Sequence, residues 1–565
     1  MILRDALLNA LATIAGTRDF HLHVLSSSPR KHSGLFPYAK PRPRVYLQDI
    51  LILLSEYASS SSSSLTPSTP QRVLVTAIEA NVYNVPSTSC GILYISKVDG
   101  TAQGIAPSPT STLVKALIRF YADPKTRPIH VDTIWVQLFA RAQSQYLFPN
   151  SAEFEKKKPL SDVMLCKWWR RVFGEVAQGL VSGGSEGTAE EGKIKARLYY
   201  VLPGYNKLEA EQSLKLSLTA TSSSSSQPQP QWTYGHPYTQ TEIPLPCPPN
   251  PKGHTGLGHF IPSFDDDPKN RFMDEIALTT DSNSIKSPKK KKPRTVSGGK
   301  PNSKARPARD EEAAVEKKKE KEDEEEGEQE TSKAQGELDK VTPDEFWERM
   351  SFRQECIAGA VTGFFALGVT SNARSVPLVS VPSPLAPQPG QVSPRLVRRV
   401  VASLMTGHEF STTERSVRAT QVLEEAIKGL CEGIVSVGET DTAPAKSSAL
   451  SSSAKRLFLG AENDGDEEES ETTAEGDAEA LHAEAPRTPP PRRAHLPEVS
   501  PNPFPEPVTS LETYHSHIYG TVSVSNPALP PKSSVAGGGE NGAGAVQDQP
   551  VRVLAVRKKK RKTDS

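Results

Sequence analysis

Apolar positions in the first part of the chain predict helices and strands in alternation. Near the N-terminus, four of them recur at helical spacing: Leu3, Leu7, Leu11 and Ile14. This pattern is typical of an amphipathic core helix rather than of a signal peptide. The β-branched and aromatic runs Val73–Tyr83, Gly91–Ile95 and Ala196–Leu202 predict strands. Further helices are expected at Leu113–Phe120, near Val131–Ala142, and from Trp168 to Leu180.

The later part of the chain holds two more predicted helices. Thr342, Pro343 and Asp344 form a typical helix start ahead of Phe346 and Trp347, because a Thr cap followed by Pro favours the first helical turn. The last helix carries an apolar stripe: Val417, Val422, Leu423, Ile427, Leu430 and Ile434. We expect this helix to close the core.

Polar stretches of low complexity separate these elements. Residues 281–338 are almost entirely charged or small, and residues 439–545 are rich in Ser, Pro and Glu. Such segments cannot bury enough apolar area to offset the entropy lost on ordering. The sequence therefore predicts a single α/β domain with two parts, residues 1–280 and 339–438. The remaining expectations are a disordered charged loop at 281–338, a disordered tail at 439–545 and a basic segment at 546–565.

Composition agrees with one medium-sized core diluted by disordered segments. Hydrophobic residues make up 36% of the 565 residues, and there are 49 prolines, above the usual share of roughly 5%. The net charge of +1 excludes a uniformly basic nucleic-acid coat and an acidic buffer protein. The five cysteines show no Cys-x-x-Cys spacing, so we expect neither a disulfide framework nor a zinc ribbon. The apolar run Cys356–Val369 is too short to span a membrane, which takes about 20 residues.

Aromatic and cationic residues gather between residues 141 and 158. Tyr146 and Phe148 are followed by three lysines at 156–158. One interpretation is a helix end packed by the aromatic residues, with the lysines in solvent. The other is a groove that stacks an aromatic ligand and neutralises its phosphates.

Trp168 and Trp169 are adjacent on a predicted helix and must point in different directions. Either both are structural, or one packs in the core while the other lines a cleft.

Three consecutive carboxylates, Asp265, Asp266 and Asp267, precede Pro268 and Lys269. Their mutual repulsion predicts a raised pKa or a cationic partner for at least one of them. Asp267 also fits the cap of a helix that begins at Pro268. That structural role does not exclude a role in proton transfer.

The predicted helix start near residues 107–112 suits a pyrophosphate, because its backbone N–H groups are free and Ser108, Thr110 and Ser111 add hydroxyls. The sequence lacks a Walker loop, a dinucleotide fingerprint and a kinase signature set. It also lacks the Gln/Arg-x-x-Gly-x-Gly/Ala loop of the commonest acetyltransferase superfamily.

Several motifs in series resemble the fungal histone acetyltransferases of the regulator-of-transposition family. The main ones are Ser144–Pro149, Lys167-Trp168-Trp169, Asp266–Lys269 and Arg271-Phe272. The resemblance covers about residues 1–280 and 340–435 and the last dozen residues. It implies a fold similar to that of the CREB-binding-protein acetyltransferases, with a central mixed sheet surrounded by helices. It also implies transfer of acetyl from acetyl-CoA to lysines in the globular core and tail of histone H3.

The resemblance implies roles for individual residues. Asp267 is expected to act as acid/base or orienting group, with Asp266 beside it. Trp169 would line the lysine channel, and Tyr146 would protonate or stabilise the leaving thiolate. Lys269 matches a buried lysine that the family autoacetylates. On this basis we expect Asp267→Asn to keep the fold and to cut acetyl transfer severely.

The resemblance also implies contacts to acetyl-CoA and no metal cofactor. The expected contacts on the phosphate side are Val98, Asp99, Gly100, Pro107, Ser108, Pro109, Thr110 and Ser111. The rest of the pocket would be formed by Phe139, Gln143, Lys158, Pro159, Leu160 and Trp168. The stretch 107–111 has two prolines and no arginine, so neutralisation of the phosphates would rest on Lys97, Lys115 or the lysines at 156–158.

By the same resemblance, the protein is nuclear and acts on histone H3–H4 in chromatin assembly, DNA replication and the DNA damage response. Its expected partners are histone chaperones of the anti-silencing and nucleosome-assembly types. Direct DNA binding is not expected to be primary, and the basic run Lys289–Arg294 favours nuclear import. The alternative function is a non-catalytic chromatin scaffold whose charged loop and tails bind histones and chaperones. A degenerate enzyme that binds coenzyme A without turnover is the third possibility.

Overall fold

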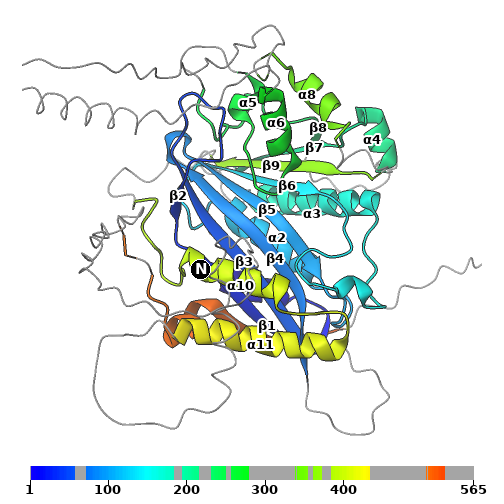
Figure 1. The fold of residues 1–565 in the computed structure, drawn as a ribbon, viewed down its shortest axis with the longest axis vertical. Helices are drawn as coiled ribbons and strands as arrows, with labels where there is room; N and C mark the ends of the chain where they lie inside the picture. Colours follow the sequence, from blue (N-terminus) through cyan, green and yellow to red (C-terminus); the bar gives the residue numbers. More distant parts are fainter. Residues whose placement is uncertain are drawn as a thin grey trace, which may run out of the picture. The chain divides into compact units, whose positions relative to one another are not determined.

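The computed structural model describes the residues that are drawn in colour in Figure 1. The described residues are 2–57, 71–183, 194–214, 231–249, 256–278, 338, 340–353, 360–371, 383–432, 504–505 and 507–527. Apart from Pro527, they belong to one compact unit, Met1–Asn526. Most of the predicted loop at 281–338, most of the predicted tail and the basic segment at 546–565 lie outside the described residues.

Strands of the described residues form one mixed sheet, which confirms the predicted fold class. They are β1 (Gly16–Ser26), β2 (Arg30–His32), β3 (Val45–Tyr57), β4 (Arg72–Val85), β5 (Cys90–Gly100), β6 (Thr133–Ala140), β7 (Ile194–Val201), β8 (Trp232–Tyr234), β9 (Gly363–Ser371) and β10 (Tyr519–Asn526). Their order is β10-β1-β3-β4-β5-β6-β9-β7-β8, with β2 beside β3. The pairs β5–β6 and β7–β8 are parallel, and the other pairs are antiparallel.

Helices cover both faces of this sheet (Figure 1). The first group is α1 (Leu3–Leu11), α2 (Thr110–Ala122) and α3 (Asp162–Gly183), which share one apolar core with the sheet. The second is α10 (Pro394–Thr406) and α11 (Thr413–Glu432), which pack on β3 and β4 in another core. The remaining α-helices of the described residues are α4 (Lys207–Ser213), α5 (Leu257–Phe260), α6 (Pro268–Leu278), α8 (Pro343–Met350) and α13 (Leu511–Thr513).

Most of the predicted elements are confirmed by the structure. The strands β4, β5 and β7 and the helices α1, α2, α3, α8 and α11 lie where the apolar patterns place them. The helix start at Thr342 is also confirmed, because its side chain accepts a hydrogen bond from the Glu345 N–H at 3.2 Å. Ile14 lies beyond the end of α1 but is still buried.

The prediction of a helix near Val131–Ala142 is wrong, because this segment contains the strand β6. Trp135 packs in the core on one face of the sheet, whereas Ile134 and Val136 pack in the core on the other. A strand that is buried on both faces has no polar positions in alternation. Apart from the buried Gln137, residues 134–140 form one apolar run, and periodicity alone does not separate such a run from a buried helix.

The prediction of a disordered tail at 439–545 is wrong around β10. This strand pairs with β1 in antiparallel register, from Gly16 opposite Asn526 to His23 opposite Tyr519. In Figure 1 the C-terminal segment, drawn in orange, lies beside α11. The average composition of the tail hides this strand, because Ser and Thr occupy its exposed positions. The helix α11 is therefore not the last element of the core. At the other segment predicted to be disordered, Leu338 is buried, which contradicts the prediction at that residue.

We expect a chain that ends at residue 503 to be less stable than a chain that ends at residue 527. The longer chain keeps β10 and the buried side chains Tyr514, Ile518 and Val524. Each buried side chain of this size contributes about 1.5–3 kcal/mol, and loss of β10 also exposes the edge of β1. Urea unfolding of the two chains measures the difference. Equal midpoints and slopes would contradict the role of this segment.

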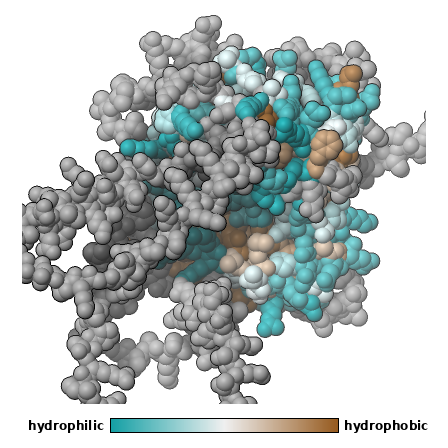
Figure 2. All heavy atoms as spheres, turned by 45° about the horizontal axis from the view of Figure 1, so that its top comes forward, coloured by the Kyte–Doolittle hydropathy of each residue, from teal (hydrophilic) through white to brown (hydrophobic). Residues whose placement is uncertain are grey.

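The described surface is largely hydrophilic on the face shown in Figure 2, and hydrophobic residues form small groups on it. Phe352, Leu208 and Val508 are the most exposed of the large apolar residues described. Within the described residues, every helix is too short or too polar to cross a bilayer.

Candidate active site

A large cavity lies where the parallel strands β5 and β6 end. Its volume is about 710 Å³, within the range of about 300–1,000 Å³ that ligand pockets occupy. Residues 95–100 of β5, the loop that leads to α2, the end of β6 and one side of α3 form its walls. Crevices at the carboxyl ends of parallel strands are common ligand sites in open α/β sheets.

The structure brings the whole predicted set of acetyl-CoA contacts together around this cavity. The lining includes Val98, Asp99, Gly100, Pro107, Ser108, Pro109, Thr110, Ser111, Phe139, Gln143, Lys158, Pro159, Leu160 and Trp168. These residues come from five separate stretches of the chain. Their shared position supports the prediction, and the contact of each residue with acetyl-CoA stays a prediction.

One end of the cavity is suited to anionic groups. The helix α2 begins there at Thr110, and the hydroxyl of Thr110 lies 2.9 Å from that of Ser108. The N-terminus of a helix carries partial positive charge and free N–H groups. Exposed cations at Arg141, Lys158 and Arg171 also line the cavity. By contrast, Lys115, which we considered as a phosphate partner, lines a different cavity and pairs with Glu175.

Asp99 shapes the wall of the cavity from within. Its Oδ2 accepts hydrogen bonds from the backbone N–H groups of Tyr146, Leu147 and Phe148 at 2.7, 2.9 and 3.2 Å. Its Oδ1 accepts from the Lys157 ammonium at 2.9 Å and from the N–H of Gly100 at 2.8 Å. Since both oxygens are occupied and the side chain is buried, Asp99 holds the 146–148 segment rather than offering a free carboxylate.

Aromatic side chains form the middle of the cavity wall. Trp168 and Trp169 meet edge to face, with ring centroids 4.6 Å apart. Both line the cavity, and Trp169 is also buried in the core. This arrangement favours the interpretation in which one tryptophan packs in the core while the other lines a cleft. Tyr146 lines the same cavity, and its hydroxyl donates to the carbonyl of Arg141. Burial raises the pKa of Tyr146 to about 12, so the phenol stays protonated at neutral pH.

Asp266 lies at the edge of the cavity. Its carboxylate accepts a hydrogen bond from Ser96 and lies 3.2 Å from the Lys97 ammonium, and both of these partners line the cavity. About half of the Asp266 side chain is exposed. The predicted cationic partner for the acidic run is thus confirmed. Asp266 is the member of the run whose carboxylate is held by residues of the cavity.

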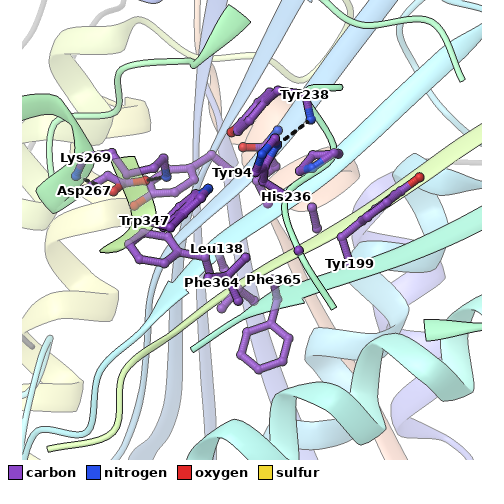
Figure 3. Close-up of a pocket in the computed structure, with 15 residues that line it drawn as sticks. Tyr94, Leu138, Tyr199, His236, Tyr238, Asp267, Lys269, Trp347, Phe364 and Phe365 are labelled. Carbon is purple, nitrogen blue, oxygen red and sulfur yellow. Dashed lines mark hydrogen bonds and ion pairs between the residues drawn. The ribbon is translucent and has the colours of Figure 1, made fainter. Parts of the chain in front are cut away.

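Asp267 lies in a second, much smaller cavity, shown in Figure 3, together with Lys269. The two side chains are almost fully buried and form an ion pair next to Trp347 and Phe364. Asp267 also precedes the helix α6 and accepts from the backbone N–H of Lys269 at 2.9 Å, which confirms its position at the helix start. Burial lowers the pKa of Lys269, and the neighbouring Asp267 opposes that shift.

The predicted catalytic residues therefore fall into two groups. Trp169 and Tyr146 line the large cavity and Asp266 lies at its edge, whereas Asp267 and Lys269 line the small one. Leu138 contributes to the walls of both. The burial predicted for Lys269 is confirmed, and its acetylation stays a prediction.

Further charged residues near the large cavity escaped the sequence analysis as site residues. Arg171 lines the cavity, but an exposed arginine on a helix is too common to indicate a site. Arg18 and Glu56 form a buried ion pair beside the cavity. Glu56 follows the apolar run Ile50–Leu54 of its strand, and a charged residue at such a place is a signal of a buried pair. Arg18 stands between Thr17 and Asp19 and gives no such signal. Within the described residues, His, Cys, Asp and Glu form no group of three or more suited to a metal ion.

Comparisons with known proteins find histone acetyltransferases. The model of the histone acetyltransferase KAT11-type domain matches residues 121–426. The histone acetyltransferase rtt109 of Aspergillus flavus is 27% identical over 380 residues, which cover 65% of this chain and 56% of that protein. The histone acetyltransferase rtt109 of Schizosaccharomyces pombe is 21% identical over 354 residues, which cover 62% of this chain and 68% of that protein.

A solved structure has the same fold. It is the crystal structure of Rtt109 from Aspergillus fumigatus, with a TM-score of 0.52 and 23% sequence identity. The match covers 75% of this chain and 96% of the solved one. The family match over more than half of the chain, together with these relatives, confirms the resemblance found in the sequence. The chain belongs to the KAT11-type histone acetyltransferase family, with the fungal Rtt109 proteins as its relatives.

Proposed function

We propose that the protein is an enzyme that transfers acetyl from acetyl-CoA to lysines of histone H3. The observation that carries the proposal is the large cavity, which has an end suited to anions and an aromatic wall, and whose lining residues Ser96 and Lys97 hold one accessible carboxylate. Cations and the start of α2 suit the phosphates, and the apolar wall formed by Trp168 and Leu160 suits the rest of the cofactor.

The reaction needs a neutral lysine amine on the substrate. A free lysine has a pKa of about 10.4, so a base must take its proton before the amine attacks the thioester. The amine nitrogen then bonds to the acetyl carbon, the C–S bond breaks and the thiolate leaves. Asp266 is the accessible carboxylate at the edge of the cavity, which suits it to accept the proton. Tyr146 carries a proton at neutral pH and suits the leaving thiolate.

The finer parts of the proposal concern substrate and partners. We propose histone H3–H4 as substrate, presented by histone chaperones of the anti-silencing and nucleosome-assembly types, in the nucleus. The proposed processes are chromatin assembly, DNA replication and the DNA damage response. Support comes from the sequence resemblance and from the relatives, which are described as histone acetyltransferases.

The test is transfer of labelled acetyl from acetyl-CoA to H3–H4, with and without a histone chaperone. We expect Trp168→Ala to lower transfer by about tenfold or more, since it removes a wall that positions the reactants. Lys115→Ala is the matched control, because Lys115 lies outside the large cavity, and it should keep full activity. A melting temperature for each variant separates lost activity from lost folding.

Two outcomes would contradict the proposal. Saturable binding of acetyl-CoA by the folded protein without any transfer would favour the scaffold or the degenerate enzyme. Equal transfer by wild type and Trp168→Ala would mean that the large cavity takes no part in the reaction.

A further inference from the structure

A buried ion pair joins two strands beside the large cavity. Arg18 of β1 donates to both carboxylate oxygens of Glu56 of β3, with Nε–Oε2 at 2.8 Å and Nη2–Oε1 at 2.6 Å. The side chains are 0% and 1% exposed. A buried pair of this kind contributes little net stability, because the cost of removing two charges from water offsets their attraction. The role of the pair is therefore more one of fixing local geometry than of adding stability.

Both members of the pair also hold the loop that precedes α2. The free Nη1 of Arg18 donates to the carbonyl of Pro107 at 2.7 Å. Glu56 Oε1 accepts from the backbone N–H of Ile105 at 3.0 Å. The ion pair therefore makes two hydrogen bonds to the loop backbone, one at the N–H of Ile105 and one at the C=O of Pro107. The loop residues 104–110 line the large cavity, and so does Glu56.

Gly104 lets the loop come close enough for these contacts. A Cβ atom at this position would overlap Glu56 Oε1 and would lie 2.7 Å from Val75 Cγ1. Any larger residue would therefore push the loop away from the pair, as only glycine fits such a close approach. The loop is further held on either side of this point. The Thr101 hydroxyl donates to the carbonyl of Leu74 at 2.7 Å, and the Thr110 hydroxyl lies 2.8 Å from that of Thr76.

We propose that Arg18 and Glu56 are positioning residues that hold the loop at 104–107 in the shape that binds the phosphate end of acetyl-CoA. This inference rests on the proposed function of the large cavity. A loop held in its binding shape before the ligand arrives avoids the entropy cost of ordering on binding. Loss of the pair therefore raises the KM for acetyl-CoA and leaves kcat nearly unchanged, because neither residue touches the reacting atoms.

The decisive variant is the double replacement Arg18→Met with Glu56→Leu. Apolar residues of similar volume commonly replace a buried ion pair without loss of stability, so we expect this variant to fold. The expected result is a KM for acetyl-CoA raised by about tenfold, with kcat within about twofold of wild type. Gly104→Ala, which changes no charge, should raise the KM in the same direction. The affinity for coenzyme A, measured by calorimetry, should fall in parallel for both variants.

A second ion pair on the same strand provides the matched control. Arg30 and Asp49 form a bidentate pair between β2 and β3, at 2.6 and 2.9 Å, and they do not line the large cavity. Arg30→Met with Asp49→Leu should leave the KM unchanged. A wild-type KM in the stable Arg18→Met/Glu56→Leu variant would overturn the inference and leave the proposed function intact. Failure of the wild-type protein to bind coenzyme A would overturn both.

Discussion

Replacement of Asp267 by Asn is expected to lower the free energy of unfolding by about 3–5 kcal/mol, the usual cost of leaving one member of a buried ion pair alone. The sequence resemblance predicts an intact fold for this variant, whereas the structure places Asp267 and Lys269 in a buried pair with almost no exposed side-chain surface. The change leaves the Lys269 ammonium among aromatic rings without its carboxylate. Urea unfolding at neutral pH measures the loss.

The stability lost in Asp267→Asn is expected to depend on pH. Burial places the pKa of Lys269 in the folded protein below its ordinary value of 10.5. Between these two pKa values the unfolded chain binds more protons, so the contribution of Lys269 to stability rises as the pH rises towards about 10.5. Asp267 opposes this shift, so its removal lowers the pKa of Lys269 in the folded protein further. The pH range over which stability rises then begins at a lower pH. The deficit of Asp267→Asn should therefore be smaller at pH 10 than at pH 7.

Two comparison variants separate the causes. Asp267→Asn with Lys269→Met removes both charges and should recover part of the lost stability. Glu175→Gln removes an exposed carboxylate that pairs with Lys115, and it should change stability by less than about 1 kcal/mol. If Asp267→Asn were as stable as wild type but inactive, the direct role in acetyl transfer that the sequence resemblance implies would be favoured over the structural one.

Replacement of Asp99 by Asn is expected to weaken binding of acetyl-CoA by tenfold or more. An amide has one oxygen and one NH₂ group, and the NH₂ group would face donors that now meet a carboxylate oxygen. Either the three N–H groups at 146–148 or the Gly100 N–H and the Lys157 ammonium lose their acceptor. Each unsatisfied buried donor costs about 1–3 kcal/mol, so the 146–148 segment is expected to move. Calorimetric titration with coenzyme A measures the loss.

Asp123→Asn is the control for this variant. Asp123 Oδ1 accepts from the backbone N–H of Lys125 at 2.9 Å in an exposed turn after α2, so the same chemical change should leave coenzyme A binding as in wild type. An Asp99→Asn protein with wild-type affinity would show that the 146–148 segment needs no carboxylate to keep its shape.

Local patterns in the sequence were sufficient for elements with one buried side. The stripe that runs through α11 and the capped start of α8 each depend on residues three or four positions apart, and short-range spacing records such contacts. The strand β6 is buried on both faces by segments distant in the sequence. Its apolar and polar residues therefore do not alternate with the two-residue period of a strand. The strand β10 depends on a pairing with β1, and the composition of its surroundings says nothing of such a partner.

For the candidate site, motifs that resemble one family were enough to predict which residues lie together. The 14 predicted contacts to acetyl-CoA, of which Val98 is the first and Trp168 the last, all line the large cavity. Only the tertiary structure decided which carboxylate of the acidic run contacts residues of that cavity. Asp266 and Asp267 are neighbours in the chain, yet the start of α6 turns one towards Ser96 and Lys97 and the other into a buried pair with Lys269. The direction of a side chain and the charge it meets are set by packing between distant elements, and a linear sequence does not record them.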